Sequence, residues 1–130
     1  MGVRFPSVQS TTLLTAVLGQ NVETAIVTSP PFTPPLDGSL IIIMVYWQAN
    51  IPAGTTQVTN RIRRGSGVAG QLVNVFATDR VTASLGYSTT LVYVDTPGNV
   101  SGLQYTFTAG TVAAGATGVV NDACIIVFAL

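Results

Sequence analysis

Short runs in which apolar and polar residues alternate constrain the fold of this chain more than any other feature. Thr55 to Arg64, Gln71 to Thr78 and Tyr87 to Val94 each repeat one kind of side chain at every second position. This period is typical of strands with one buried face. Apolar residues nowhere recur at helical spacing over three turns with supporting caps. The sequence therefore predicts an all-β protein of about eight strands and no long helix.

One run departs from the alternation. Leu40 to Trp47 is apolar without interruption and rich in β-branched and aromatic residues. Strands that are covered on both faces have such continuous runs. We expect this segment to be the central strand of the core, with one side facing the interior and the other a neighbouring subunit or layer. Burial of both sides within a monomer is the competing explanation.

Proline and glycine divide the strands. Pro30, Pro31, Pro34 and Pro35 lack amide donors, so this stretch cannot be an interior strand and suits a crossover between two sheets. Thr96-Pro97-Gly98-Asn99 predicts a type II turn. The fold class expected is an antiparallel β-sandwich or jelly roll. Residues 1–20 form an N-terminal arm or first strand, and residues 21–130 form a single sandwich domain.

Charged residues are scarce and balanced. The chain has no histidine and no lysine, and its five arginines equal its five acidic residues. Charged residues make up 8% of the chain, against about 25% in ordinary soluble domains. A neutral surface provides little of the repulsion that keeps proteins apart in solution, so the composition favours assembly. It argues against nucleic-acid binding, which usually needs a basic surface.

The residue inventory excludes most catalytic chemistry. Without histidine there is no Ser-His-Asp or Cys-His triad, and zinc sites built from histidine and cysteine are equally absent. Cys124 lies in an apolar run and is interpreted as a small buried residue. Asp95 and Asp122 could form a carboxylate pair only if the fold brought them together. We expect no enzyme activity, no metal and no cofactor. No apolar run reaches the roughly 20 residues of a membrane helix.

Two groups are candidates for an interface. Arg61 and Arg63 share a strand face and, with Arg64, could hold carboxylates or phosphates in two-pronged contacts. Salt bridges within the chain, or solvation, are the alternative. Tyr46 and Trp47 end the apolar run, where they either pack in the core or anchor a contact, because aromatic residues are enriched at interface hot spots.

Several short motifs resemble small jelly-roll structural proteins of tailed bacteriophages, with the general look of tumour necrosis factor-like trimers. They are Arg61-Ile62-Arg63-Arg64-Gly65, Asp95-Thr96-Pro97-Gly98, Tyr105-Thr106-Phe107-Thr108 and the terminal Ile125 to Leu130. The resemblance covers residues 39–130. It implies a homotrimer used as a head decoration, spike or fibre module of a virion.

Two functions follow as hypotheses. The first is a non-enzymatic capsid decoration or cement protein that is made in the host cytoplasm, binds the capsid surface and uses residues 1–20 as a candidate docking arm. The second is a receptor- or glycan-binding head module of a phage spike or fibre, in which an exposed tryptophan or tyrosine would stack on sugar rings. Neither reading requires a membrane.

Overall fold

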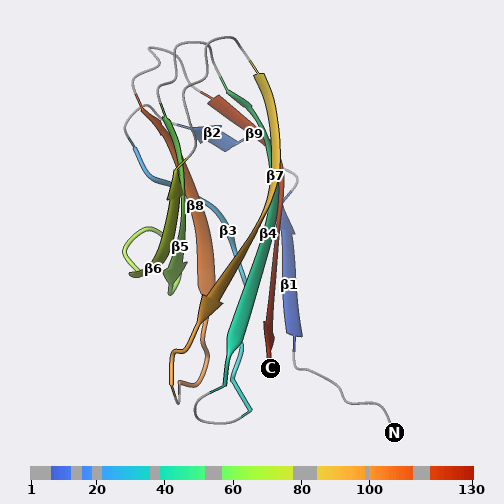
Figure 1. The fold of residues 1–130 in the computed structure, drawn as a ribbon, viewed down its shortest axis with the longest axis vertical. Helices are drawn as coiled ribbons and strands as arrows, with labels where there is room; N and C mark the ends of the chain where they lie inside the picture. The colour runs from blue at the N-terminus through green and yellow to red at the C-terminus, as the bar shows by residue number, and fades with distance from the viewer. Residues whose placement is uncertain are drawn as a thin grey trace, which may run out of the picture.

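The computed structural model describes residues 7–12, 16–18, 22–35, 39–51, 57–77, 85–98, 100–112 and 118–130. These residues form two antiparallel sheets that face each other, as expected for a β-sandwich (Figure 1). The strands are β1 (Ser7–Thr12), β2 (Ala16–Leu18), β3 (Thr24–Thr28), β4 (Ile41–Ile51), β5 (Gln57–Arg64), β6 (Gln71–Ala77), β7 (Leu85–Asp95), β8 (Tyr105–Val112) and β9 (Gly118–Ala129).

The order of the strands is that of a jelly-roll type of sandwich. The first sheet has the order β1-β9-β4-β7, with β2 also paired to β9, and the second sheet has the order β3-β8-β5-β6. After β2, every connection except the β5–β6 hairpin passes from one sheet to the other. Such crossovers between two antiparallel sheets are what jelly rolls share.

The N-terminal segment contributes an edge strand in two pieces. Thr12 pairs with Ala123 and Ala16 pairs with Val120, so β1 and β2 follow one another along β9. This interruption brings the described strands to nine, where the sequence predicts about eight. The rest of residues 1–20 lies outside the described residues.

β4 occupies the centre of the first sheet, as the apolar run predicts. It pairs with β7 on one side and with β9 on the other. Every second side chain is buried against the second sheet, and fully burying one such side chain contributes about 1.5–3 kcal/mol. These inward residues are Ile41, Ile43, Val45, Trp47, Ala49 and Ile51. Ile42 and Met44 on the other side are half-buried, and Tyr46 is exposed, so the described chain does not bury both sides of the strand.

An aromatic contact joins the two sheets. Trp47 of β4 and Phe107 of β8 are both fully buried, and their ring centroids lie 5.4 Å apart with the rings inclined at 60°. Tilted aromatic pairs of this kind add about 0.5–1.5 kcal/mol beyond the burial of their area. The contact places Trp47 in the core of the sandwich.

The connections predicted from proline and glycine lie outside the main strands. Phe32, within the proline-rich crossover, is buried and exchanges backbone hydrogen bonds of 2.8 and 2.7 Å with Leu103. Gly98 has a φ of +78°, as the second central position of a type II turn requires. Asn99, the last residue of the predicted turn, lies outside the described residues.

Two positions differ from simple alternation. A register shift between Ala25 and Val27 lets both Ile26 and Val27 face the core, where alternation predicts opposite faces. Such a bulge adds one residue to one strand of a pair. Thr59 points away from Val58 and Asn60 as predicted, yet it is only 7% exposed. Thr59 is paired with Ala77 of β6 and Gly110 of β8, and its Oγ1 donates a hydrogen bond of 3.4 Å to Gln57 Oε1.

Candidate interaction surface

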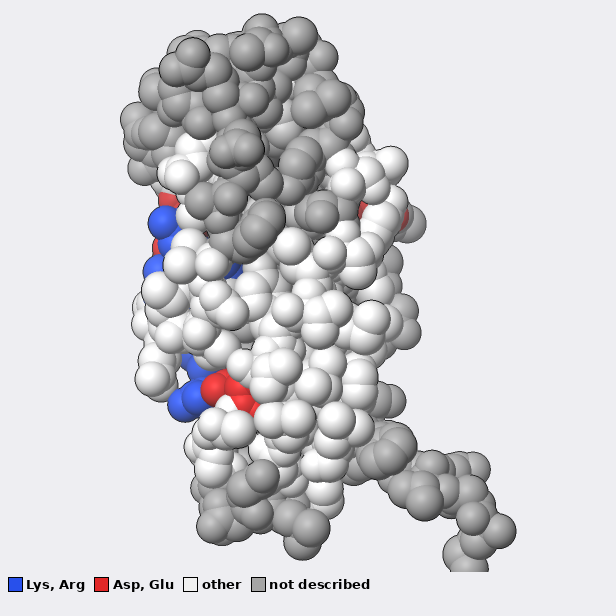
Figure 2. All heavy atoms as spheres, in the orientation of Figure 1, with Lys and Arg blue, Asp and Glu red and all other residues white. Residues whose placement is uncertain are grey.

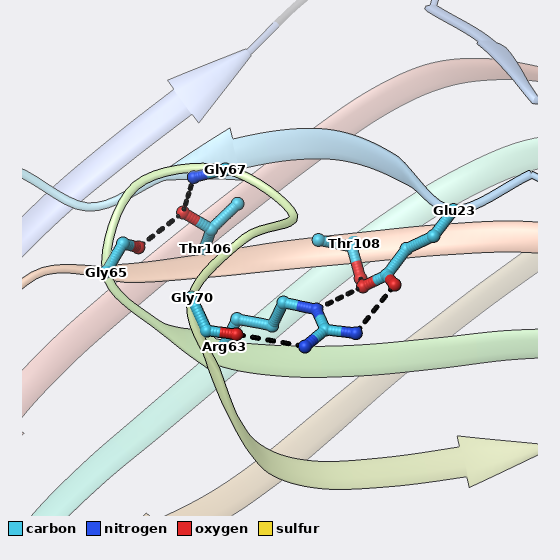
Figure 3. A network of polar contacts seen from close by, with 7 residues as sticks. All are labelled: Glu23, Arg63, Gly65, Gly67, Gly70, Thr106 and Thr108. Carbon is cyan, nitrogen blue, oxygen red and sulfur yellow. Dashed lines mark hydrogen bonds and ion pairs between the residues drawn. The ribbon is translucent and has the colours of Figure 1, made fainter.

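Arg63 is held by groups of the same chain on the outer side of the second sheet. Its guanidinium donates from Nε and Nη2 to the two carboxylate oxygens of Glu23, the second bond being 2.7 Å, and from Nη1 to the Gly70 carbonyl at 2.9 Å (Figure 3). Thr108 Oγ1 donates to the same carboxylate at 2.6 Å. The hydrogen bond from Arg63, above all, holds the pKa of Glu23 below its ordinary value.

The β5–β6 connection folds over β8 beside this ion pair. The Thr106 hydroxyl donates to the Gly65 carbonyl at 2.8 Å and accepts from the Gly67 amide at 3.0 Å (Figure 3). Gly70 passes so close to the strand that a Cβ there would lie 2.4 Å from the Arg64 carbonyl oxygen. The loop therefore covers Thr106, which is fully buried although it belongs to the outer side of β8.

Arg64 joins the two sheets at the end of the sandwich. Nε and Nη2 donate to the Asp95 carboxylate at 3.0 and 2.7 Å, and the buried Tyr105 hydroxyl donates to it at 2.6 Å. Burial alone would raise the pKa of Asp95, but the hydrogen bonds from Arg64 and Tyr105 outweigh it and lower the pKa. Arg64 is thus committed to an internal pair.

The third arginine is less engaged. Arg61 is half-buried, and no hydrogen bond or ion pair is found for it within the described part of the chain. Arg61 and Arg63 lie two positions apart in β5 and so share a face, as the alternation predicts, and the charge of Arg61 contributes to lowering the pKa of Glu23. The carboxylate that these arginines face belongs to their own chain. The alternative of internal salt bridges therefore describes Arg63 and Arg64.

Tyr46 and Trp47 lie on opposite sides of β4. Trp47 is 0% exposed, so its packing in the core replaces the expected role as an interface anchor. Tyr46 is 37% exposed on the outer side of the first sheet, and its hydroxyl accepts a weak hydrogen bond from Ser88 Oγ at 3.4 Å. Only Tyr46 of the two is available to a partner.

The outer side of the first sheet around Tyr46, which we call the outer face, is largely apolar. The strand register places β4 between β7 and β9 and sets the apolar side chains in rows. One row is Val94, Ile42 and Phe128, and the next is Val92, Met44 and Ile126. Val92 and Val94 are 60% and 51% exposed, and the other four are half-buried. Isolated exposed apolar residues are ordinary, whereas a continuous patch indicates an interaction site.

The outer face becomes polar toward its other end. Tyr46 lies between Thr90 and Cys124, and Gln48 lies between Ser88 and Asp122. Asp122 is the one charged side chain among the described residues of these four rows. In Figure 2, charged atoms occupy a few small groups, and most of the described surface in that view carries neither acidic nor basic side chains.

The sequence pattern indicates Tyr46 as a candidate but does not indicate the valines of β7 or the large residues of β9. A signal was present, because β9 has apolar residues at both parities from Ala123 onward, as β4 does. By itself such a run indicates only a buried terminal strand. The pairing of β9 with β4 depends on the order of the strands in the sheet, and a local sequence pattern does not contain that order.

The two candidate carboxylates are far apart. Asp95 pairs with Ile41 and Asp122 pairs with Gln48, so seven residues of β4 separate their rows. At about 3.3 Å per residue this separation is about 23 Å, whereas glycosidase carboxylates lie about 5–9.5 Å apart. They cannot act on one bond. The described residues contain no cluster of histidine, cysteine, aspartate or glutamate that could hold a metal ion, and no helix long and apolar enough to cross a membrane.

Comparison with solved structures identifies the fold. A structure from infectious bursal disease virus, Gx strain, matches with a TM-score of 0.59 and 12% identity over 98% of this chain. The VP2 subviral particle of that virus matches at 0.54 and 12% over 97%. This chain spans 33% of each of these viral proteins. The globular domain of zebrafish complement 1qA matches at 0.55 and 13%, with 95% of each chain covered. No protein-family model and no curated protein sequence matches the chain.

Proposed function

We propose that the chain is a non-enzymatic structural module of a virion, which assembles with copies of itself and decorates the capsid surface. The observation that carries the proposal is the outer face. Six apolar side chains lie there in two adjacent rows, and Val92 and Val94 are more than half exposed. A second protein surface over these rows would remove them from water.

The composition supports a copy of the same chain as the partner. With five positive and five negative residues, two copies have little net charge to repel each other. Arg63 and Arg64 already neutralise Glu23 and Asp95 within the chain. The apolar rows therefore dominate the contact, which suits a lasting oligomer because permanent interfaces are more hydrophobic than transient ones. A homotrimer is the oligomer that the resemblance to tumour necrosis factor-like proteins implies.

The capsid role is supported by the fold. Viral capsid proteins and complement globular domains share it with this chain, which indicates a structural or binding module. A compact domain with few charged residues suits attachment to a shell. The virion surface is the location that this role implies.

Light scattering measures the oligomer directly. The unmodified chain should have three times the mass of one copy, and a Val92→Asp/Val94→Asp variant should have the mass of one copy while it keeps the circular dichroism spectrum of the folded chain. Val75→Asp is the matched control, because Val75 is 49% exposed on β6 of the other sheet. A monomeric unmodified chain would remove the basis of the proposal.

Co-sedimentation tests the capsid contact. The chain should pellet with capsid shells of the virus that encodes it and remain in the supernatant without them. Removing residues 1–20 is a poor test of a docking arm, because β1 and β2 pair with β9 and their loss exposes that edge. Substitutions in residues 1–6 test the arm without removing a strand.

A receptor- or glycan-binding role is the second candidate, and Tyr46 favours it. Its exposed side chain lies among the exposed polar residues Gln48, Ser88 and Thr90, which could hydrogen-bond sugar hydroxyls around a stacked ring. A glycan array separates the two functions. Retention that is lost in Tyr46→Ala, together with no binding to capsids, would favour the second candidate.

A further inference from the structure

Asn60 places an unpartnered amide inside the sandwich. It lies in β5 between the inward-facing Val58 and Ile62, and it is 0% exposed. Neither Oδ1 nor Nδ2 has a hydrogen-bond partner among the described residues. An amide can donate two hydrogen bonds and accept two, and buried polar groups in native proteins nearly always have partners. Burying the Asn60 amide without any hydrogen-bond partner would lower the stability of the folded state.

A second unpartnered group lies on the same inner surface. Thr111 of β8 is 1% exposed, and its Oγ1 has no hydrogen-bond partner among the described residues. Asn60 pairs with Ala109, whereas Thr111 pairs with Val58. Thr111 is therefore the diagonal neighbour of Asn60, at a typical Cα separation of about 7–8 Å. The two side chains do not bond directly, and such a separation suits a single bridging molecule.

The surroundings restrict what the bridging molecule can be. The inward side chains of β5 and β8 next to Asn60 and Thr111 are uncharged: Val58, Ile62, Phe107 and Ala109. An ion among them would have no opposite charge, and burying an isolated charge is prohibitive. A small neutral molecule that both donates and accepts hydrogen bonds satisfies the amide and the hydroxyl together. The Ala109 methyl group leaves more room beside Asn60 than a larger residue would.

We propose that Asn60 and Thr111 form an internal water-binding site between the sheets. One water molecule can accept from Asn60 Nδ2, donate to Asn60 Oδ1 and accept from the Thr111 hydroxyl. Buried waters typically make about three hydrogen bonds to groups that otherwise lack partners. The site is independent of the outer face and of any partner.

A high-resolution crystal structure of the full chain tests the site directly. The expected result is a solvent peak within about 2.7–3.2 Å of an amide atom of Asn60 and of Thr111 Oγ1. In solution, NMR should detect magnetisation transfer between the Asn60 side-chain amide and a water molecule. The residence time of that water molecule should be longer than that of water in the bulk. A dry interior, or a direct bond from Asn60 to another protein group, would overturn the proposal.

Substitutions test whether the two residues share the water. Asn60→Leu and Thr111→Val should each shift the melting temperature, and the shift from Thr111→Val should shrink once Asn60 is leucine, because the water has already left. Thr90→Val on the exposed side of β7 is the control and should change nothing in either background. Additive shifts would contradict a shared water. If Asn60→Leu does not fold, loss of the solvent peak in Thr111→Val provides the same test.

Discussion

Arg64 and Asp95 link the ends of β5 and β7 through two hydrogen bonds of 3.0 and 2.7 Å, so one ion pair ties the two sheets of the sandwich together. The Asp95 side chain is only 9% exposed, and Tyr105 donates to the same carboxylate. Side chains of two strands, Arg64 of β5 and Tyr105 of β8, thus bind one negative charge on a third strand, β7. At this end of the sandwich an ion pair and hydrogen bonds hold the two sheets together, whereas apolar side chains hold them together at the centre.

Asp95→Asn should destabilise the fold by about 2 kcal/mol, because a hydrogen bond to a buried charged group contributes about 1.5–3 kcal/mol. Urea denaturation followed by tryptophan fluorescence measures the loss. Asp122→Asn is the matched control, since no partner is found for its buried Oδ1 among the described residues. That variant should stay within about 0.5 kcal/mol of the unmodified chain. Equal stability of the two variants would contradict the role of the ion pair.

Stability should fall in acid and remain level near neutrality. Hydrogen bonds from Arg63 lower the pKa of Glu23, and those from Arg64 and Tyr105 outweigh burial to lower the pKa of Asp95. A lowered pKa in the folded state stabilises above the unfolded value and is lost as the pH falls through the folded value. The unfolded values are 4.5 and 3.8, so the free energy of unfolding should decline below about pH 4.5.

The free energy of unfolding should also decline at alkaline pH. Burial, above all, raises the pKa of Tyr105. The contribution of the protonated Tyr105 hydroxyl to the free energy of unfolding is therefore complete below the unfolded pKa of 10.0 and declines as the pH rises above that value. No histidine is present to titrate between about pH 5.5 and 8. A pH series of urea denaturation curves should therefore be flat in that interval. A slope there would mean that another group controls stability.

Gly70→Ala should disrupt the β5–β6 loop, because its Cβ would lie 2.4 Å from the Arg64 carbonyl oxygen and the backbone would have to move. We expect a loss of about 2–3 kcal/mol, the upper part of the range for overpacking. Gly67→Ala is the control: its φ is +83° but its Cβ would meet nothing within 4 Å. The strain of that backbone conformation alone is about 1–2 kcal/mol. Thermal unfolding of both variants gives the comparison, and a smaller loss at Gly70 would contradict the close approach.

Val58→Asp and Phe107→Asp should abolish folding, because both side chains are 0% exposed between the sheets. The matched control is Val75→Asp, at a valine of the same sheet that is 49% exposed. Thr59→Asp, which the alternation alone would suggest as harmless, should also destabilise the chain, since Thr59 is 7% exposed. Soluble yield and circular dichroism report the outcome. Equal folding of Val58→Asp and Val75→Asp would refute the assignment of the inner face.

Much of the strand pattern could be predicted. Alternation correctly places Tyr93 and Val92 on opposite faces of β7, where Tyr93 is buried and Val92 exposed, and it correctly places Ile62 on the buried face of β5. It fails at Ile26 and Val27, where a bulge turns both inward. It also assigns Thr59 to water, because alternation gives the side of a sheet but not what covers that side. The apolar outer face required the order of β7, β4 and β9, which no local pattern contains.

The sequence by itself determined the class of fold and the scarcity of charge, because side-chain alternation is a property of the extended backbone and composition needs no structure. Only the tertiary structure decided where the arginines are used. Glu23 is 40 residues from Arg63, and Asp95 is 31 residues from Arg64. Crossovers between the sheets bring these residues together, and the same crossovers leave the apolar rows of the first sheet uncovered by the described chain. Local patterns specify which way a side chain points, whereas the folded topology specifies what it meets.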